Sequence, residues 1–174
     1  ELERFIDAMN AIYAEIKGFA NNCRAYHMAA PDPSGEDAAA LMREALRDAQ
    51  LQPAEVDYIN AHGTATKAND RCESKAIELV FGPRVESVYV SSTKSQIGHT
   101  IGASGALGAI AAALSVRDGV IPPNINCQEV DEECRIRIAH QAVKTKVRNA
   151  FVNSFGFGSN NAAIVLGEPH QGER

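Results

Sequence analysis

One segment of the sequence, residues 102–116, restricts the possible folds more than any other. It reads GASGALGAIAAALSV, and its residues are small or apolar on every side. A helix without a polar face is buried all round, and small side chains let neighbouring elements approach closely. A chain of 174 residues with a single sheet offers this helix only one layer. We therefore expect a second layer to come from a partner or from another half of the protein.

The rest of the sequence alternates short apolar runs with segments of helical periodicity. We expect strands at 12–19, 56–60, 88–92, 136–140, 150–155 and 162–167. We expect helices over 1–9 and 102–117. Two further helices are expected, one that follows the capping residues Ser34 and Asp37 and ends at 48, and one that follows a cap at Asn69 or Asp70 and ends at 81. This order predicts an α/β fold whose sheet is parallel or mixed and carries helices on its faces.

Charge and composition exclude several classes of protein. The chain has 17 basic and 22 acidic residues and a net charge of −5, whereas nucleic acids and anionic membranes are bound by basic surfaces. No apolar run predicts a membrane span, and the first ten residues lack the apolar core of a signal peptide. The four cysteines are too few and too scattered for a disulfide scaffold. We expect one cytoplasmic domain, residues 1–174, with a polar tail at 168–174.

Three loops that follow expected strands carry the unusual polar residues. Their sequences are NAHGTAT at 60–66, STKSQIGH at 92–99 and NSFGFGSNN at 153–161. The carboxyl ends of parallel strands lie at one edge of a sheet, where sites form, so His62, Lys94 and His99 are candidates for one site. The alternative is that each histidine has a structural role, and the pattern favours the two interpretations equally.

Glu73 shares a face of its expected helix with Ala76, Ile77 and Val80. That face is apolar, so we expect the carboxylate to be buried and to need a partner, for which Lys94 is a candidate. The alternative is a carboxylate at the rim of the face. The spacing of the histidines and cysteines fits no standard metal site, so no metal is expected.

A basic stretch runs from Arg135 to Arg148 without an acidic residue. A solvated edge strand is the more usual explanation for such a run. An acidic partner is the alternative.

Taken together, these motifs resemble those of the β-ketoacyl-acyl-carrier-protein synthases, condensing enzymes of the thiolase superfamily. The chain resembles the C-terminal half of such an enzyme, of the fatty-acid or type II polyketide kind, from about residue 12 to residue 166. AHGTAT with Asp70 and Glu73, SSTKSQIGH and NSFGFG carry the resemblance. It implies a thiolase-like fold, in which this chain forms one half of a five-layered α/β/α/β/α sandwich with a mixed sheet. The apolar helix would then lie in the middle layer.

The resemblance also implies a reaction and a role for each matching residue. The reaction is the decarboxylative Claisen condensation of an acyl thioester with a malonyl carrier protein. His62 and His99 would be the catalytic histidines, and Lys94 would order and polarise the site. The other matches are structural support by Glu73 and Asp70, phosphopantetheine binding by Thr64 and Thr66, and an oxyanion and gatekeeper role for Phe157. No cofactor is tightly bound in the family, because an acyl carrier protein presents the substrate on its phosphopantetheine arm.

The chain departs from the family in two respects. Residues 155–161 contain GFGSNN instead of the commoner GFGGTN, and no residue matches the nucleophilic cysteine of the N-terminal half. One hypothesis is an active enzyme in which a second chain or segment supplies that cysteine in a dimeric or heteromeric assembly. A second is a non-catalytic subunit similar to a chain-length factor, and a third is a thiolase relative with another acyl-transfer reaction.

Overall fold

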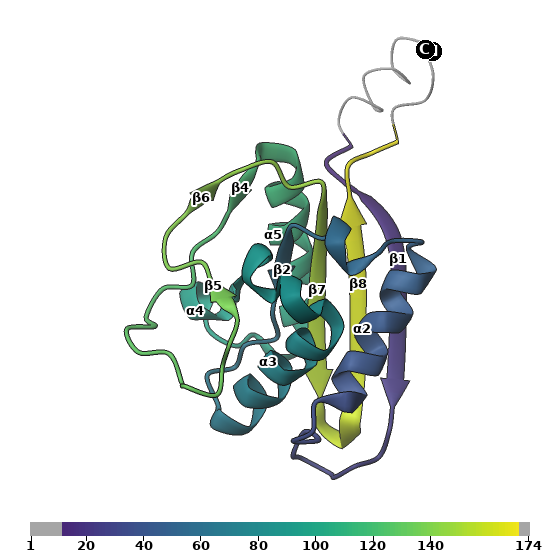
Figure 1. The fold of residues 1–174 in the computed structure, drawn as a ribbon, viewed down its shortest axis with the longest axis vertical. Coiled ribbons are helices and arrows are strands. Elements are labelled where there is room, and N and C mark those ends of the chain that lie inside the picture. Colours follow the sequence, from purple (N-terminus) through teal and green to yellow (C-terminus); the bar gives the residue numbers. More distant parts are fainter. Residues whose placement is uncertain (1–11, 171–174) are drawn as a thin grey trace.

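The computed structural model of the protein describes residues 12–170 (Figure 1). Six strands form one mixed sheet in the order β1–β8–β7–β2–β3–β5. Strands β1, β8 and β7 are antiparallel neighbours, whereas β7, β2, β3 and β5 run parallel. The strands are β1 (Glu15–Cys23), β2 (Tyr58–Asn60), β3 (Tyr89–Ser91), β5 (Arg137–Ile138), β7 (Asn149–Gly156) and β8 (Asn160–Gly167). A second, two-stranded sheet pairs β4 (Val120–Ile121) with β6 (Val143–Lys144). The helix expected over 1–9 lies outside the described residues.

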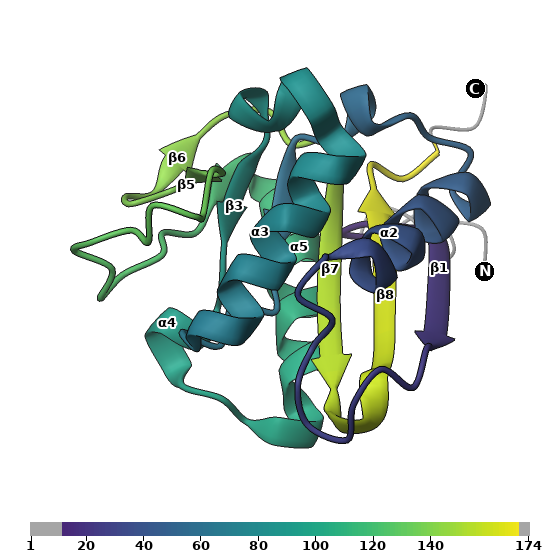
Figure 2. The same cartoon turned by 60° about the horizontal axis from the view of Figure 1, so that its bottom comes forward.

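Helices cover both faces of the large sheet, as Figures 1 and 2 show. The α-helices are α2 (Glu36–Asp48), α3 (Lys67–Phe81), α4 (Lys94–Ile97) and α5 (Ser104–Asp118), and short 3-10 helices span Pro53–Glu55, Gly82–Ser87, Ile101–Ala103 and Phe157–Ser159. Helices α2 and α3 pack on one face and α5 on the other. Because side chains alternate along a strand, Ile59 and Phe151 belong to the hydrophobic core between the sheet and helices α2 and α3. Tyr58 and Ala150 belong to the core between the sheet and α5. The expected α/β architecture is confirmed.

Helix α5 is buried on one side only. Its residues in contact with the sheet are small, and Gly108 lies so close that a Cβ there would be 2.9 Å from the Asn60 Oδ1. On the opposite side Ile110 is 55% exposed. Within the described residues, only the six-stranded sheet packs against α5. The second layer that the sequence led us to expect on its other side is not among these residues.

Helix α3 begins earlier than the sequence pattern predicts. Its N-cap is Thr66, whose φ of −104° and ψ of 134° are those of extended backbone. The prediction of a cap at Asn69 or Asp70 was wrong, because the Asp70 N–H already bonds to the Thr66 carbonyl within the first helical turn, at 2.9 Å. The Asp70 carboxylate faces the backbone of the preceding loop instead of capping its own helix.

Three residues of the basic stretch have partners within the described part of the chain. Lys146 pairs with Glu168 at 3.1 Å, Arg148 pairs with Asp57 at 3.3 Å, and the Arg137 guanidinium lies 3.7 Å from the centre of the Tyr89 ring. These contacts favour the interpretation as a solvated edge over that of a surface for an acidic partner. No helix among residues 12–170 has the length and apolar character that crossing a membrane requires.

Candidate active site

His62 lies directly after β2 and is only 8% exposed. Its Nδ1 accepts a hydrogen bond from the backbone N–H of Phe155 in β7, with an N···N distance of 3.2 Å. The Lys94 Nζ lies 3.5 Å from the same Nδ1. Because Nδ1 is the acceptor, the proton of the neutral ring is carried by Nε2. The neighbouring strand thus selects the tautomer of His62.

The charge state of His62 follows from its surroundings. Burial, the positive charge of Lys94 and the nearby His99, in that order of importance, together lower the pKa of His62 to about 3. The ring is therefore neutral at physiological pH. In that state it is a hydrogen-bond donor through Nε2 and does not need to lose a proton first.

Glu73 is 2% exposed, as its place on the apolar face of α3 predicts. Its Oε1 accepts hydrogen bonds from the His62 N–H at 2.8 Å and from the Asn153 side chain at 3.0 Å, and its Oε2 accepts one from the Gly63 N–H at 2.9 Å. The candidate partner Lys94 does not bond to this carboxylate in the structure, because its Nζ lies beside the His62 ring. Burial raises the pKa of Glu73, and the three donors oppose that rise.

Asp70, one helical turn before Glu73, holds the next part of the same loop. Its Oδ1 accepts a hydrogen bond from the Asn69 side chain at 3.1 Å, and the backbone N–H groups of Ala65 and Thr64 lie near enough to act on its pKa. Burial nevertheless raises the pKa of Asp70. Of the two carboxylates at i and i+3 on α3, Glu73 binds the N–H groups of residues 62 and 63, and Asp70 faces the backbone of the two residues that follow.

His99 follows α4 and faces His62 from the second loop. The two ring centres are 5.7 Å apart, with an angle of 86° between the ring planes. The His99 Nδ1 accepts a hydrogen bond from the Ile101 N–H at 3.1 Å and lies 3.0 Å from the Ser104 Oγ. Both histidines thus use Nδ1 to bind backbone N–H groups, which leaves both Nε2 atoms free for other partners.

Lys94 begins α4 and is half-buried beside the two histidines. Burial lowers the pKa of Lys94, and the negative charge of Glu73 opposes this effect. The loops that carry His62 and Lys94 pack closely: at Gly63, where φ is +40°, a Cβ would lie 2.6 Å from the Ser92 Cβ. Glycine is required there, because any larger residue would push the loops apart.

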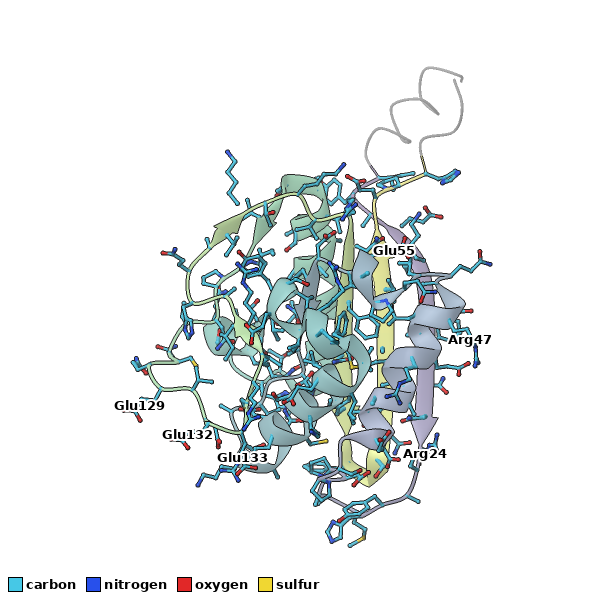
Figure 3. All side chains as sticks on the ribbon, in the orientation of Figure 1. Arg24, Arg47, Glu55, Glu129, Glu132 and Glu133 are labelled. Carbon is cyan, nitrogen blue, oxygen red and sulfur yellow. The ribbon has the colours of Figure 1, made fainter. Side chains whose placement is uncertain are left out.

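A cavity of about 900 Å³ opens beside these residues. His99, Lys94 and Thr64 line one part of it, and the loop between β4 and β5 lines another. The Arg71 Nε binds the Asp131 Oδ2 of that loop at 3.0 Å, which fastens the loop to α3. Figure 3 shows Glu129, Glu132 and Glu133 along this loop between β4 and β5, on the side of the molecule away from β1 and β8. The Thr64 hydroxyl lies 3.0 Å from the Thr66 hydroxyl.

Phe157 is placed apart from the other candidates. It begins the turn between β7 and β8, and it is 82% exposed. Its neighbour Phe155 is the residue that contacts His62, with ring centres 5.3 Å apart. The sequence analysis missed Phe155, Asn153 and Ser104 as parts of the site. Asn153 and Phe155 belong to the NSFGFG motif, so the motif itself carried the signal.

The four cysteines are free. Burial raises the pKa of Cys72 to about 12 and that of Cys134 to about 11, with nearby carboxylates acting in the same direction. Both thiols are therefore protonated and weakly nucleophilic. Among residues 12–170, no group of three or more histidine, cysteine, aspartate and glutamate side chains is arranged to hold a metal ion.

The lowered pKa of His62 predicts a loss of stability in acid. Its folded-state pKa of about 3 lies below the ordinary value of 6.5, so below pH 6.5 the unfolded chain binds a proton that the folded chain does not. Between pH 7 and pH 5 this linkage is expected to cost about 2 kcal/mol of unfolding free energy. Urea unfolding of the wild type and of His62→Gln at both pH values measures it. An equal pH dependence in the two proteins would contradict a neutral, buried His62.

Sequence and structure comparisons give the family of the chain. Residues 13–128 match the family described as beta-ketoacyl synthase, C-terminal domain. The chain belongs to the β-ketoacyl synthase family. The 3-oxoacyl-[acyl-carrier-protein] synthase 2 of Coxiella burnetii is 45% identical over 167 residues, which is 95% of this chain and 40% of that protein. The Staphylococcus aureus enzyme of the same name is 44% identical over 156 residues, 89% of this chain and 39% of its own length.

Solved ketosynthase structures have the same fold. The ishigamide ketosynthase/chain length factor superposes with a TM-score of 0.88 at 41% identity, over 96% of this chain and 41% of that one. A type II polyketide ketosynthase, solved in complex with its acyl-carrier protein, gives a TM-score of 0.87 at 34% identity, over 90% of this chain and 38% of that one. This ketosynthase domain therefore has the thiolase-like fold that the sequence motifs implied, and it spans about 40% of the length of these relatives.

Proposed function

We propose that the chain supplies the histidine and lysine part of the active site of a β-ketoacyl-acyl-carrier-protein synthase. The observation that carries this proposal is the arrangement of His62 and His99. Each Nδ1 accepts a hydrogen bond from a backbone N–H, the ring centres lie 5.7 Å apart, and His99 lines the cavity. Two Nε2 atoms available for hydrogen bonding suit a carbonyl oxygen that becomes negatively charged during the reaction.

The proposed reaction begins with a malonyl thioester on a carrier protein. His62 and His99 donate hydrogen bonds to the thioester carbonyl while the C–C bond to the carboxylate breaks and carbon dioxide leaves. The electron pair moves to the carbonyl oxygen and gives an enolate, which the two donors stabilise. The enolate carbon then attacks an acyl thioester, and that thiolate leaves. Lys94 adds positive charge to the site and helps to keep His62 neutral.

The remaining candidates take positioning roles in this proposal. Glu73 and Asp70 hold the backbone of residues 62–65. Thr64 and Thr66 bind the phosphopantetheine arm in this proposal, since Thr64 lines the cavity and its hydroxyl lies 3.0 Å from that of Thr66. Phe157 is the gatekeeper, and its backbone N–H contributes to an oxyanion hole for the acyl thioester. No tightly bound cofactor takes part, and an acyl carrier protein is the delivering partner.

The nucleophilic cysteine is proposed to come from a second chain or segment. Raised pKa values disfavour the thiolates of Cys72 and Cys134, and none of the four cysteines takes part in the contacts around His62 and His99. The exposed outer side of α5 offers a surface for the structure that would carry the nucleophile. The chain would thus act as the C-terminal thiolase-like domain of a dimeric or heteromeric assembly.

A second candidate is a non-catalytic subunit similar to a chain-length factor. Two similar solved structures contain a ketosynthase together with a chain length factor. Such a subunit would shape the pocket of a partner and would not need donors at His62 and His99. The hydrogen-bonded arrangement of both histidines and of Lys94 favours the catalytic role.

Denaturing intact-mass analysis of natively purified protein distinguishes the two functions. If the protein is catalytic, the preparation is expected to contain a polypeptide with a cysteine that a thiol-directed inhibitor of condensing enzymes labels stoichiometrically. The same preparation is then also expected to decarboxylate malonyl carrier protein. Labelling is expected to stop once an acyl group occupies that cysteine. A folded preparation that contains no such thiol and releases no carbon dioxide would contradict the catalytic proposal and support the chain-length-factor role.

A further inference from the structure

The segment that follows β4 is fastened to the loop that carries Lys94. Four hydrogen bonds join them: the Ser92 N–H donates to the Asn124 Oδ1 at 3.0 Å, the Ile125 N–H to the Ser95 Oγ at 3.2 Å, the Asn126 side chain to the Ser95 carbonyl at 3.0 Å, and the Gln96 side chain to the Pro123 carbonyl at 2.8 Å. Lys94 lies inside the fastened stretch, so residues 123–126 can determine where its ammonium group is held.

Asn124 makes the bond that leads most directly to Lys94. Its partner Ser92 is only 4% exposed, so the Ser92 N–H depends on an acceptor inside the protein. The Ser92 Oγ in turn accepts a hydrogen bond from the Lys94 N–H at 3.3 Å. At the other end of this residue, the Lys94 Nζ lies 3.5 Å from the His62 Nδ1. Two hydrogen bonds therefore connect the Asn124 amide with the first residue of α4.

The backbone of Asn124 is anchored independently of the loop that it holds. Its N–H donates to the Ala139 carbonyl at 2.7 Å, and the Ala139 N–H donates to the Val90 carbonyl at 2.9 Å. Val90 belongs to β3, and Ala139 directly follows β5, so the asparagine is attached to the large sheet. A side chain on a rigid element holds its bonded partner in a defined place.

We propose that Asn124 is a positioning residue, which holds Lys94 beside His62 by accepting the Ser92 N–H. Two other roles would act independently of Lys94. One is a purely structural contribution to the fold, and the other is direct contact with substrate, because Asn124 also lines the cavity. The consequence for the reaction rests on the proposed condensing function, whereas the position of Lys94 does not.

The substitution Asn124→Leu removes the acceptor at similar side-chain size, and Asn124→Asp keeps an oxygen in its place. Asn124→Leu is expected to slow the decarboxylation of malonyl carrier protein about tenfold, the scale of one lost hydrogen bond, and Asn124→Asp to keep most of the rate. Asn124→Ala removes the same acceptor without adding apolar surface, so it is expected to match Asn124→Leu.

Combination with Lys94→Met separates positioning from the two other roles. If Asn124 acts through Lys94, the double variant Asn124→Leu/Lys94→Met is expected to be no slower than Lys94→Met alone. Rates are measured on the complete, natively purified protein with all copurifying chains. Effects of the two substitutions that multiply would overturn the proposal.

NMR of the His62 ring nitrogens during acid titration tests the same link without substrate. The charged and titratable groups around this ring are Lys94 and His99 from the second loop and Glu73, which binds the His62 backbone. Because the charge of Lys94 disfavours the imidazolium, Lys94→Met is expected to raise the pKa of His62. Asn124→Leu is expected to raise it by the same amount or less, with no further rise in the double variant.

Asn21→Leu is the matched control, since it makes the same chemical change at an exposed position of β1, at the opposite edge of the sheet. It is expected to leave both the rate and the His62 titration unchanged. A His62 titration in Asn124→Leu that equals the wild type would overturn the proposal. A raised pKa in a preparation that does not decarboxylate malonyl carrier protein would support the positioning role and contradict the condensing function.

Discussion

Replacing His99 with alanine is expected to slow the decarboxylation of malonyl carrier protein by on the order of 10²-fold or more. This is the scale for the loss of one preorganised donor to a developing oxyanion. The His99 Nδ1 is engaged by the Ile101 N–H, so its Nε2 is the atom available to the substrate. Carbon dioxide release from labelled malonyl carrier protein, in the presence of all copurifying chains, measures the effect.

Two variants make the His99 test specific. The glutamine amide nitrogen of His99→Gln reaches a position similar to that of the histidine Nε2, so part of the rate is expected to return. His140→Ala, at an exposed histidine outside the site, is expected to keep the full rate. A rate that is unchanged in His99→Ala would exclude the catalytic role and favour the function as a chain-length factor.

Replacing Glu73 with alanine is expected to lower the free energy of unfolding by on the order of 3–5 kcal/mol. The substitution leaves the N–H groups of His62 and Gly63 and the Asn153 amide without their acceptor inside the protein. The raised pKa of Glu73 indicates that burial of its charge costs free energy. Removing the carboxylate also removes this cost, which offsets part of the loss in unfolding free energy. Decarboxylation is expected to be lost as well, because the loop that presents His62 is no longer held.

Glu78→Ala provides the control on the same helix. Glu78 is half-buried and lies 3.8 Å from the Lys75 Nζ, and an ion pair of this kind contributes less than about 1 kcal/mol. Urea unfolding is expected to separate the two variants clearly, and hydrogen exchange at residues 62 and 63 is expected to rise only in Glu73→Ala. Equal destabilisation by both substitutions would show that Glu73 acts through the helix and not through the loop.

The sequence was sufficient to identify the fold class because its patterns are local. The periodicity of 38–48 and the apolar run at 162–167 follow from which faces are buried, and helix α2 and strand β8 occur there. The polar loops after strands predicted a shared site for His62, Lys94 and His99, since parallel strands end at one edge of a sheet. Glu73 was predicted to be buried from its place on one face of α3, and it is.

What the sequence alone could not determine is which atoms bind one another across the sheet. The partner of Glu73 is the backbone of residues 62–63, a group that every residue carries and that no motif distinguishes. The tautomer of His62 depends on the Phe155 N–H, 93 residues away. The left-handed φ of Ser159 depends on the hairpin that closes around it. Residue types and their periodicity are properties of the chain, whereas hydrogen-bond partners and backbone strain arise only when distant segments are packed together.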